Sequence, residues 1–318
     1  MTSPLHPESI KAIPVRHRGR WVATGVILVL VAMFINMAVT NPNFEWDVIA
    51  ENLFNNKILE GVWATIWITV VAMMAGIALG VLLSVMRLSP NPLLSNVAYG
   101  YIWFFRGTPV LVQLIFWFNL AVLVPNISLG VPFGPTFISW DTNSVITPFV
   151  AALLGLGLNE AAYMAEISRA GIQSVDEGQV EASSALGMSR AQTMRRIVLP
   201  QAMRVIIPPT GNEVISMLKT TSLVSVVAMP ELFYNTQQIY ARTYQTIPLL
   251  IVASIWYLIL TSVLTTGQFY IERHYGRGSS SVKPPTFLQR LRRNVFRFHA
   301  QPPTPPSSTL LDTHGGVR

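Results

Sequence analysis

Three long stretches of this chain carry no charged side chain: residues 21–39, 61–86 and 248–271. A helix of about 20 apolar residues spans the hydrocarbon core of a bilayer, because a helix satisfies its own backbone hydrogen bonds there. Each stretch is long enough, so the sequence predicts three transmembrane helices. Only 12% of all residues are charged, about half the fraction found in typical soluble domains, and this agrees with a membrane protein.

Three further crossings are predicted from weaker patterns. Residues 107–140 are also free of charge, but prolines and glycines crowd their second half, which indicates a helix over about 95–124 followed by a loop. Residues 147–170 and 210–229 are mostly apolar and contain a few ionisable side chains. The sequence therefore predicts an all-α integral membrane protein with six transmembrane helices.

The basic residues outside these helices are distributed unevenly. One set of flanks holds 17 Lys and Arg, and the other holds only Lys57 and Arg242. Basic loops stay in the cytoplasm, so we expect a protein of the cytoplasmic membrane with both termini and the loop 171–208 inside the cell. The chain then begins with a basic cytoplasmic segment, residues 1–20, and ends with a basic, proline-rich tail, residues 273–318.

Two terminal segments need separate interpretation. The apolar run of residues 21–39 is longer than the core of about 7–15 residues in a secretory signal peptide, which favours a retained anchor helix. In the tail, apolar residues recur at helical spacing among the arginines of residues 287–298. This pattern fits either a basic amphipathic helix on the inner leaflet or a disordered cationic segment.

Several kinds of chemistry are excluded by missing residues and motifs. The chain has no cysteine, and all five histidines lie outside the predicted helices, so we expect no disulfide and no intramembrane metal site. A Gly-Lys pair for a phosphate-binding loop is absent, as is a Gly-x-Ser-x-Gly nucleophile motif. We therefore expect no enzyme and no cofactor in this chain, with any ATP and Mg²⁺ bound by another polypeptide. The uneven charge reports membrane orientation, and no nucleic-acid partner is expected.

The cytoplasmic loop 171–208 is predicted to be structured. A first short helix is expected within residues 180–188, with Glu181 suited to its start and Gly187 permitting a turn after it. Ser189 can cap a second short helix, which Pro200 would stop.

The same loop carries a spaced motif: Glu-Ala-Ser, three residues, Gly, nine residues, Ile, one residue, Leu-Pro. This motif resembles the EAA signature of the permease subunits of ABC importers, with a serine in place of the third alanine. Three more segments, which begin at Phe104, Asn159 and Gly211, resemble the permeases for polar amino acids, and the resemblance covers residues 59–272. The residues of the motif are Glu181, Ala182, Ser183, Gly187, Ile197, Leu199 and Pro200.

The resemblance implies a type I importer permease with a five-helix core. Two permease subunits, identical or different, would form the translocation path in the lipid bilayer. Two cytoplasmic ATPases would bind the EAA loops, and an extracytoplasmic binding protein would deliver the amino acid. Small residues in the loop would allow close approach to the ATPase, and Glu181 would offer it a charge. Residues 21–39 would be an extra helix in front of the core.

Ionisable residues inside a predicted crossing are costly and are candidates for the substrate path. Glu160, which follows Asn159, either receives the ammonium group of a substrate or pairs with Arg106 or with Lys219. Lys219 either binds a carboxylate or forms a buried ion pair with Glu160, and the nearby Thr221 is a further candidate for the path, as is Asn159.

Arg106 begins an Arg-Gly-Thr-Pro stretch in which Gly107 and Pro109 are expected to bend or break the helix. Arg106 then either lines a cavity beside the freed backbone or extends to the cytoplasmic headgroups. Glu166 and Arg169 are three residues apart and predict an ion pair on one helix face.

Two further features have more than one interpretation. Glu213 is expected near the start of its helix, where a carboxylate complements the helix dipole; a contact at a gate is the alternative. Gly76 and Gly80 form a small-xxx-small pair that predicts close helix packing.

Other classes of protein compete with the importer. A six-helix secondary amino-acid transporter driven by an ion gradient would use Glu160 and Lys219 for coupling and would need no docking loop. A membrane enzyme would need a catalytic dyad or metal cluster at depth. The spacing of the loop motif favours the importer, and the sequence leaves the identity of the amino acid open.

Overall fold

The structure, a computed structural model, describes residues 18–131 and 134–275. The chain divides into two units, residues 1–40 with 281–318, and residues 41–280. In the first unit the described element is α1 (Arg18–Thr40), a helix whose apolar side chains are exposed as in a lipid-facing span. The helix predicted at residues 21–39 is therefore present, and most of the predicted terminal segments lie outside the described residues.

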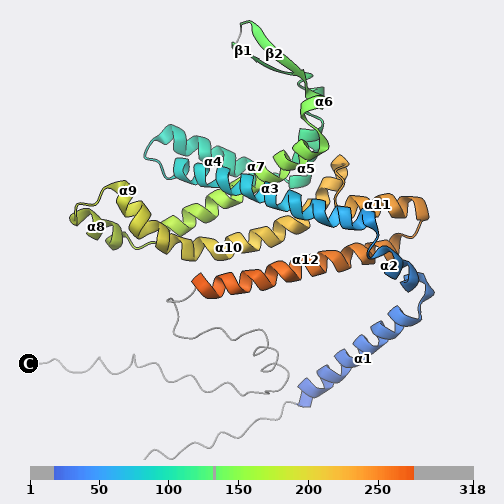
Figure 1. The fold of residues 1–318 in the computed structure, drawn as a ribbon. Helices are drawn as coiled ribbons and strands as arrows, with labels where there is room; N and C mark the ends of the chain where they lie inside the picture. The colour runs from blue at the N-terminus through green and yellow to red at the C-terminus, as the bar shows by residue number, and fades with distance from the viewer. Residues whose placement is uncertain (1–17, 132–133, 276–318) are drawn as a thin grey trace, which may run out of the picture. The chain divides into compact units, whose positions relative to one another are not determined.

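Three predicted crossings in the second unit are single helices: α3 (Asn56–Arg87), α7 (Pro148–Gln173) and α12 (Thr246–Tyr275). Two of them begin at side-chain caps, because Asn55 accepts the N–H of Lys57 and Thr147 accepts that of Val150. In Figure 1, α3 lies along α7, and α12 lies on the other side of α10. With α1, these are the described helices that can each span a membrane.

The predicted single crossing at 95–124 is two helices, α4 (Pro92–Gly107) and α5 (Val110–Phe118), which meet at an angle of 101°. The residue before a proline is forced into extended backbone and the proline lacks an N–H, and Thr108 accordingly has φ −111° and ψ 142°. The expected break at Gly107 and Pro109 is thus confirmed, whereas the predicted helix end at residue 124 is wrong.

The predicted loop after α5 contains a short 3₁₀ turn, η2 (Leu120–Val122), and an antiparallel hairpin of β1 (Asn126–Gly130) and β2 (Thr136–Asp141). The hairpin projects away from the helices and returns to α7 through α6 (Thr142–Val145) (Figure 1). The fold is thus all-α in its membrane part, with this small hairpin as an exception.

The crossing predicted at 210–229 begins eleven residues earlier, as α10 (Leu199–Thr220). Pro200 stands at the start of this helix, where its missing N–H costs nothing, so the prediction that it stops a helix was wrong. The helix continues through Pro208 and Pro209, tightens into η4 (Thr221–Val227) and bends by 48° into α11 (Leu232–Thr243). If each bent pair is one span, the candidate spans number six.

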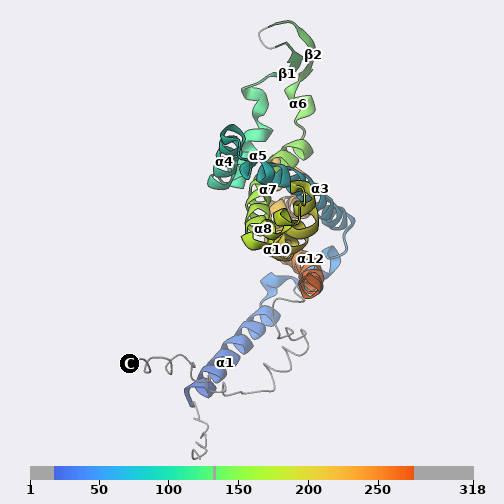
Figure 2. The same ribbon diagram turned by 90° about the vertical axis from the view of Figure 1, so that its left-hand side faces the viewer.

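Between α7 and α10 the chain forms α8 (Glu177–Ala185), α9 (Arg190–Thr193) and a π-helical turn, η3 (Met194–Val198). These elements lie at one end of the bundle (Figures 1 and 2). At the other end lie α11 and two short elements that the sequence did not predict, η1 (Pro42–Phe44) and α2 (Trp46–Asn52).

The core of the bundle depends on close packing of α3 against α7. A Cβ atom at Gly76 would lie 2.6 Å from Cγ of Glu160, and one at Gly80 would lie 2.6 Å from Cβ of Met164. The prediction that these two glycines serve packing is therefore confirmed. The Glu160 side chain packs directly against Gly76, so a side chain at position 76 would displace it.

Candidate functional site

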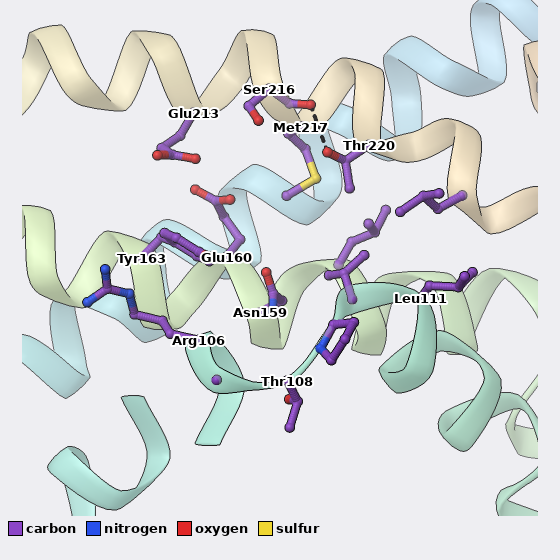
Figure 3. Close-up of a pocket in the computed structure, with 15 residues that line it drawn as sticks. Arg106, Thr108, Leu111, Asn159, Glu160, Tyr163, Glu213, Ser216, Met217 and Thr220 are labelled. Atoms are coloured by element: carbon purple, nitrogen blue, oxygen red, sulfur yellow. Dashed lines mark hydrogen bonds between the residues drawn. The ribbon is translucent and has the colours of Figure 1, made fainter. Parts of the chain in front are cut away.

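A pocket of about 710 Å³ lies between the α4–α5 bend, α7 and α10 (Figure 3). This volume is within the range of pockets that bind small molecules. The break at Pro109 provides one wall, and polar and charged side chains of α7 and α10 provide the other two. The polar residues that line it are Arg106, Thr108, Asn159, Glu160, Tyr163, Glu213, Ser216 and Thr220.

Two carboxylates face one another across this pocket, Glu160 from α7 and Glu213 from α10 (Figure 3). Glu160 is 4% exposed, and its buried Oε1 has no hydrogen-bond partner among the described residues. An unpaired polar atom away from water is costly, so the site is suited to a ligand that donates hydrogen bonds or carries positive charge.

Arg106 stands at the edge of the same pocket, at the end of α4. Its guanidinium carbon lies 5.2 Å from the ring centroid of Tyr163, a distance that allows a cation–π interaction. Within the described part of the chain no hydrogen bond or ion pair holds this guanidinium. Arg106 is therefore in the cavity-lining position that the sequence left open, with donors available for an anionic group.

Asn159 holds the wall of the pocket in place. Its Nδ2 donates to the backbone oxygen of Phe105 (2.8 Å), and so does Nε2 of Gln113 (3.1 Å). The helix break leaves this carbonyl without an intrahelical partner, so Asn159 and Gln113 supply the hydrogen bonds that the bend removes.

Two of the predicted path residues do not line the pocket. Lys219 is exposed and forms no ion pair with Glu160, so the buried pair considered from the sequence is not formed. Thr221 is fully buried, and its hydroxyl donates to the backbone oxygen of Leu218. Thr220, one residue earlier, lines the pocket instead.

Glu213 is the charged pocket residue that the sequence did not place on the substrate path; the polar lining residues Thr108, Tyr163, Ser216 and Thr220 were not predicted either. The predicted helix began at residue 210, which made Glu213 a first-turn carboxylate, but α10 begins at Leu199 and places it well inside the helix. The dipole interpretation is therefore wrong. The sequence signal that could have marked Glu213 as a pocket residue is a lone carboxylate within a mostly apolar helical stretch.

Glu166 and Arg169 form the predicted ion pair on α7, with 2.6 Å between Oε2 and the guanidinium NH2 group. Among the described residues, no group of three or more His, Asp or Glu side chains is arranged to hold a metal ion.

The loop between α7 and α10 is held by its own caps. Asp176 caps α8 through the N–H of Gly178, so Glu181 lies in mid-helix and its predicted role at the helix start was wrong. Gly187 has φ +74°, which confirms the predicted turn. Ser189 and Gln192 form a capping box at α9, as expected for the serine.

The motif residues of this loop divide into buried and exposed sets. Ser183 is buried, and its hydroxyl lies 2.9 Å from that of Thr193, which ties α8 to α9. Ile197 is half-buried. Beside the motif, the Leu186 side chain is 81% exposed, which leaves a large apolar group at the loop surface. The exposed motif residues are Glu181, Ala182, Gly187, Leu199 and Pro200.

The structure is thus a helical membrane bundle with a charged pocket at a broken helix and an ordered, exposed loop at one end, a combination that would suit a transport subunit. Residues 72–277 match the family model of the binding-protein-dependent transport system inner membrane component. The chain belongs to this family, as a permease subunit of an ABC importer. The resemblance found in the sequence is thus confirmed, and the chain is not itself an enzyme.

Curated relatives and a solved structure agree with this assignment. The chain is 50% identical over 282 residues to the arginine transport system permease protein ArgU of Corynebacterium glutamicum, covering 87% of each chain. It is 33% identical to the glutamine transport system permease protein GlnP of Escherichia coli K12, over 70% of this chain and 93% of the relative. The crystal structure of an amino acid ABC transporter with histidines matches with a TM-score of 0.58 and 34% identity, covering 70% of this chain and 95% of that one.

Proposed function

We propose that this permease forms the membrane path of an ATP-driven importer for basic amino acids. The observation that carries the proposal is the pair of facing carboxylates, Glu160 and Glu213, with the unpaired guanidinium of Arg106 at the pocket edge. Every α-amino acid has one ammonium and one carboxylate, and a basic one has a second cation. Two acids and one arginine complement those three charges. The relative that is 50% identical to this chain is an arginine transport system permease protein, and this supports a basic amino acid as the substrate.

In this arrangement the substrate carboxylate binds Arg106, and its two cationic groups bind Glu160 and Glu213. Tyr163 holds the Arg106 side chain through its ring face. A neutral polar amino acid lacks the second cation and leaves one of the two carboxylates unpaired. This desolvation penalty is the physical basis for discrimination.

The loop 171–208 is the site at which the ATPase couples to the path. Its exposed motif residues and Leu186 fit a groove on a cytoplasmic ATPase, which itself carries ATP and Mg²⁺. Closure of two ATPases on nucleotide moves two such loops and turns the paths outward, and hydrolysis resets them. The other partners are a second permease subunit, identical or different, and an extracytoplasmic amino-acid-binding protein. The chain lies in the cytoplasmic membrane with both termini in the cytoplasm.

The test is uptake by proteoliposomes that contain the permease, its co-purifying ATPase and the binding protein. Radiolabelled arginine, lysine, glutamine and glutamate are compared, with ATP hydrolysis followed in parallel. We expect ATP-dependent accumulation of arginine and lysine. Accumulation of glutamate or glutamine instead would overturn the substrate class, and accumulation that follows an ion gradient without ATP would overturn the importer.

A further inference from the structure

A second pocket, of about 530 Å³, adjoins the one described above. We refer to it as the arginine pocket and to the first as the acidic pocket. The two share Arg106, Gly107 and Tyr163. The lining residues that the acidic pocket lacks are Arg87, Tyr99, Ile102, Trp103, Glu166 and Arg169.

The two pockets follow one another along the same helices. On α7 the acidic pocket is lined by Asn159, Glu160 and Tyr163, and the arginine pocket by Tyr163, Glu166 and Arg169. Asn159 to Arg169 span about three turns of the helix, and Tyr163 between them lines both pockets. Because α7 runs toward α8, the arginine pocket lies on the side of the acidic pocket nearer the loop 171–208, which we call the coupling loop.

The charge of the arginine pocket is opposite to that of its neighbour. It contains three arginines and one acid, and the acid, Glu166, is already paired with Arg169. Arg87 donates to the hydroxyl of Ser95 at 2.8 Å, but its buried Nε has no partner among the described residues. Arg106 has no hydrogen bond or ion pair there either. The pocket thus has more guanidinium donors than acceptors.

The arginines are also held in place for a ligand. The guanidinium carbon of Arg87 lies 5.1 Å from the ring centroid of Tyr99, and that of Arg106 lies 5.2 Å from Tyr163. Such stacking holds a guanidinium while its edge N–H groups stay free to bind a carboxylate in bidentate fashion.

We propose that the arginine pocket is a second binding site on the path, where Arg87 and Arg106 receive the carboxylate of the amino acid after it leaves the acidic pocket. The inference rests on the proposed function. Arg106 belongs to both pockets, so it can keep its carboxylate while the cationic groups separate from Glu160 and Glu213. The surrounding arginines repel a basic side chain, which keeps this second site weak and favours release toward the coupling-loop side.

The experiment compares Arg87→Gln with Arg87→Lys in the complete reconstituted importer, with arginine delivered by the binding protein. Arg242→Gln is the matched control, since Arg242 is exposed on α11, outside the loop 171–208, and lines neither pocket. If Arg87 acts in release, Arg87→Gln lowers the maximal uptake rate about tenfold, the effect of one charge-assisted hydrogen bond. The KM for the loaded binding protein changes less than twofold, and Arg87→Lys recovers much of the rate.

Other outcomes overturn the proposal in distinguishable ways. An unchanged maximal rate in Arg87→Gln removes Arg87 from the path. A parallel fall in ATPase association and thermal stability, shared by Arg87→Lys, assigns Arg87 a structural role. If wild-type uptake requires phosphatidylglycerol in the vesicles and Arg87→Gln abolishes that requirement, the pocket binds a lipid headgroup instead. Failure of the wild-type protein to import arginine with ATP refutes the proposed function itself.

Discussion

At the scale of single residues, the pocket depends on a carboxylate that the protein leaves partly unpaired. Glu160 is buried against Gly76, with one oxygen that has no partner among the described residues. A fold gains no stability from such a group. A cationic ligand could supply the missing interaction, and in the proposed function that ligand is the cationic group of the substrate.

The first prediction concerns that charge. Glu160→Gln keeps the shape of the side chain but removes its charge, so we expect arginine uptake to fall about tenfold or more, the equivalent of a charge-assisted hydrogen bond of about 1.5–3 kcal/mol. Uptake kinetics in proteoliposomes measure the effect. Glu60→Gln, at an exposed glutamate of α3, is the control. Equal activity of both variants would contradict a substrate role for Glu160.

A second prediction concerns the glycine beneath it. An alanine at Gly76 would place its Cβ 2.6 Å from Cγ of Glu160, whereas an alanine at Gly157 meets nothing closer than 3.5 Å. We expect Gly76→Ala to cost about 1–3 kcal/mol through overpacking and to reduce uptake by displacing Glu160, while Gly157→Ala has little effect. Thermal unfolding and uptake of the two purified variants decide this. If both alanine variants lower the unfolding temperature by the same amount, the close contact between Gly76 and Glu160 does not determine stability.

At the scale of elements, the bend between η4 and α11 is held by a buried carboxylate. Glu231 is fully buried and accepts the N–H groups of Phe233 and Tyr234 at 2.9 and 2.7 Å and the hydroxyl of Tyr257 at 2.9 Å. Thr65 of α3 lies 3.4 Å away. One side chain therefore caps α11 and joins it to α3 and α12.

The third prediction follows from that junction. Glu231→Ala leaves several buried donors without an acceptor, so we expect a loss of stability of about 3 kcal/mol or more. Asn91→Ala removes an exposed cap of α4 and is expected to cost only about 1 kcal/mol. The unfolding temperatures of both variants in detergent measure the difference. Similar temperatures would mean that the buried network adds nothing beyond ordinary capping.

A fourth prediction concerns the coupling loop. Leu186 is 81% exposed, so Leu186→Ser should leave the fold intact, yet we expect it to remove most ATPase association because an apolar anchor at an interface is lost. Leu123→Ser, at a leucine 68% exposed near the hairpin, is the control. Co-purification of the ATPase with each variant is the measurement. If the ATPase co-purifies fully with Leu186→Ser, its contact with the permease does not depend on Leu186.

At the scale of the whole molecule, the hairpin and the coupling loop mark two regions that should face opposite compartments. The chain has no cysteine, so single cysteines report sidedness without a background. Ser139 in the hairpin and Ser184 in α8 are both exposed serines, which makes them a matched pair.

The fifth prediction uses that pair. We expect Ser139→Cys to react with a membrane-impermeant maleimide from outside the cytoplasmic membrane, and Ser184→Cys to react only after the membrane is opened, because basic loops stay in the cytoplasm. Labelling of right-side-out and inside-out vesicles is the measurement. The reverse pattern would invert the topology.

The sequence by itself determined the membrane class, the long helices and the family. Charge-free runs, glycine and proline positions and motif spacing are local features, and α3, α7, α12 and the break at Pro109 follow from them. Local pattern also predicted the Glu166–Arg169 pair and the caps at Gly187 and Ser189, since their partners lie within one or two turns.

Only the tertiary structure decided which charges meet. Glu160 and Glu213 are more than fifty residues apart in the sequence, and their juxtaposition depends on how α10 packs beside α7. Proline is a strong local signal for a helix end, but Pro200 starts α10, and Pro208 and Pro209 stay inside it. The earlier start of α10 makes Glu213 a mid-helix residue, and it lines the pocket. Lys219 lies six residues after Glu213 on α10, and at about 100° per residue its side chain points about 120° away from that of Glu213, outside the pocket.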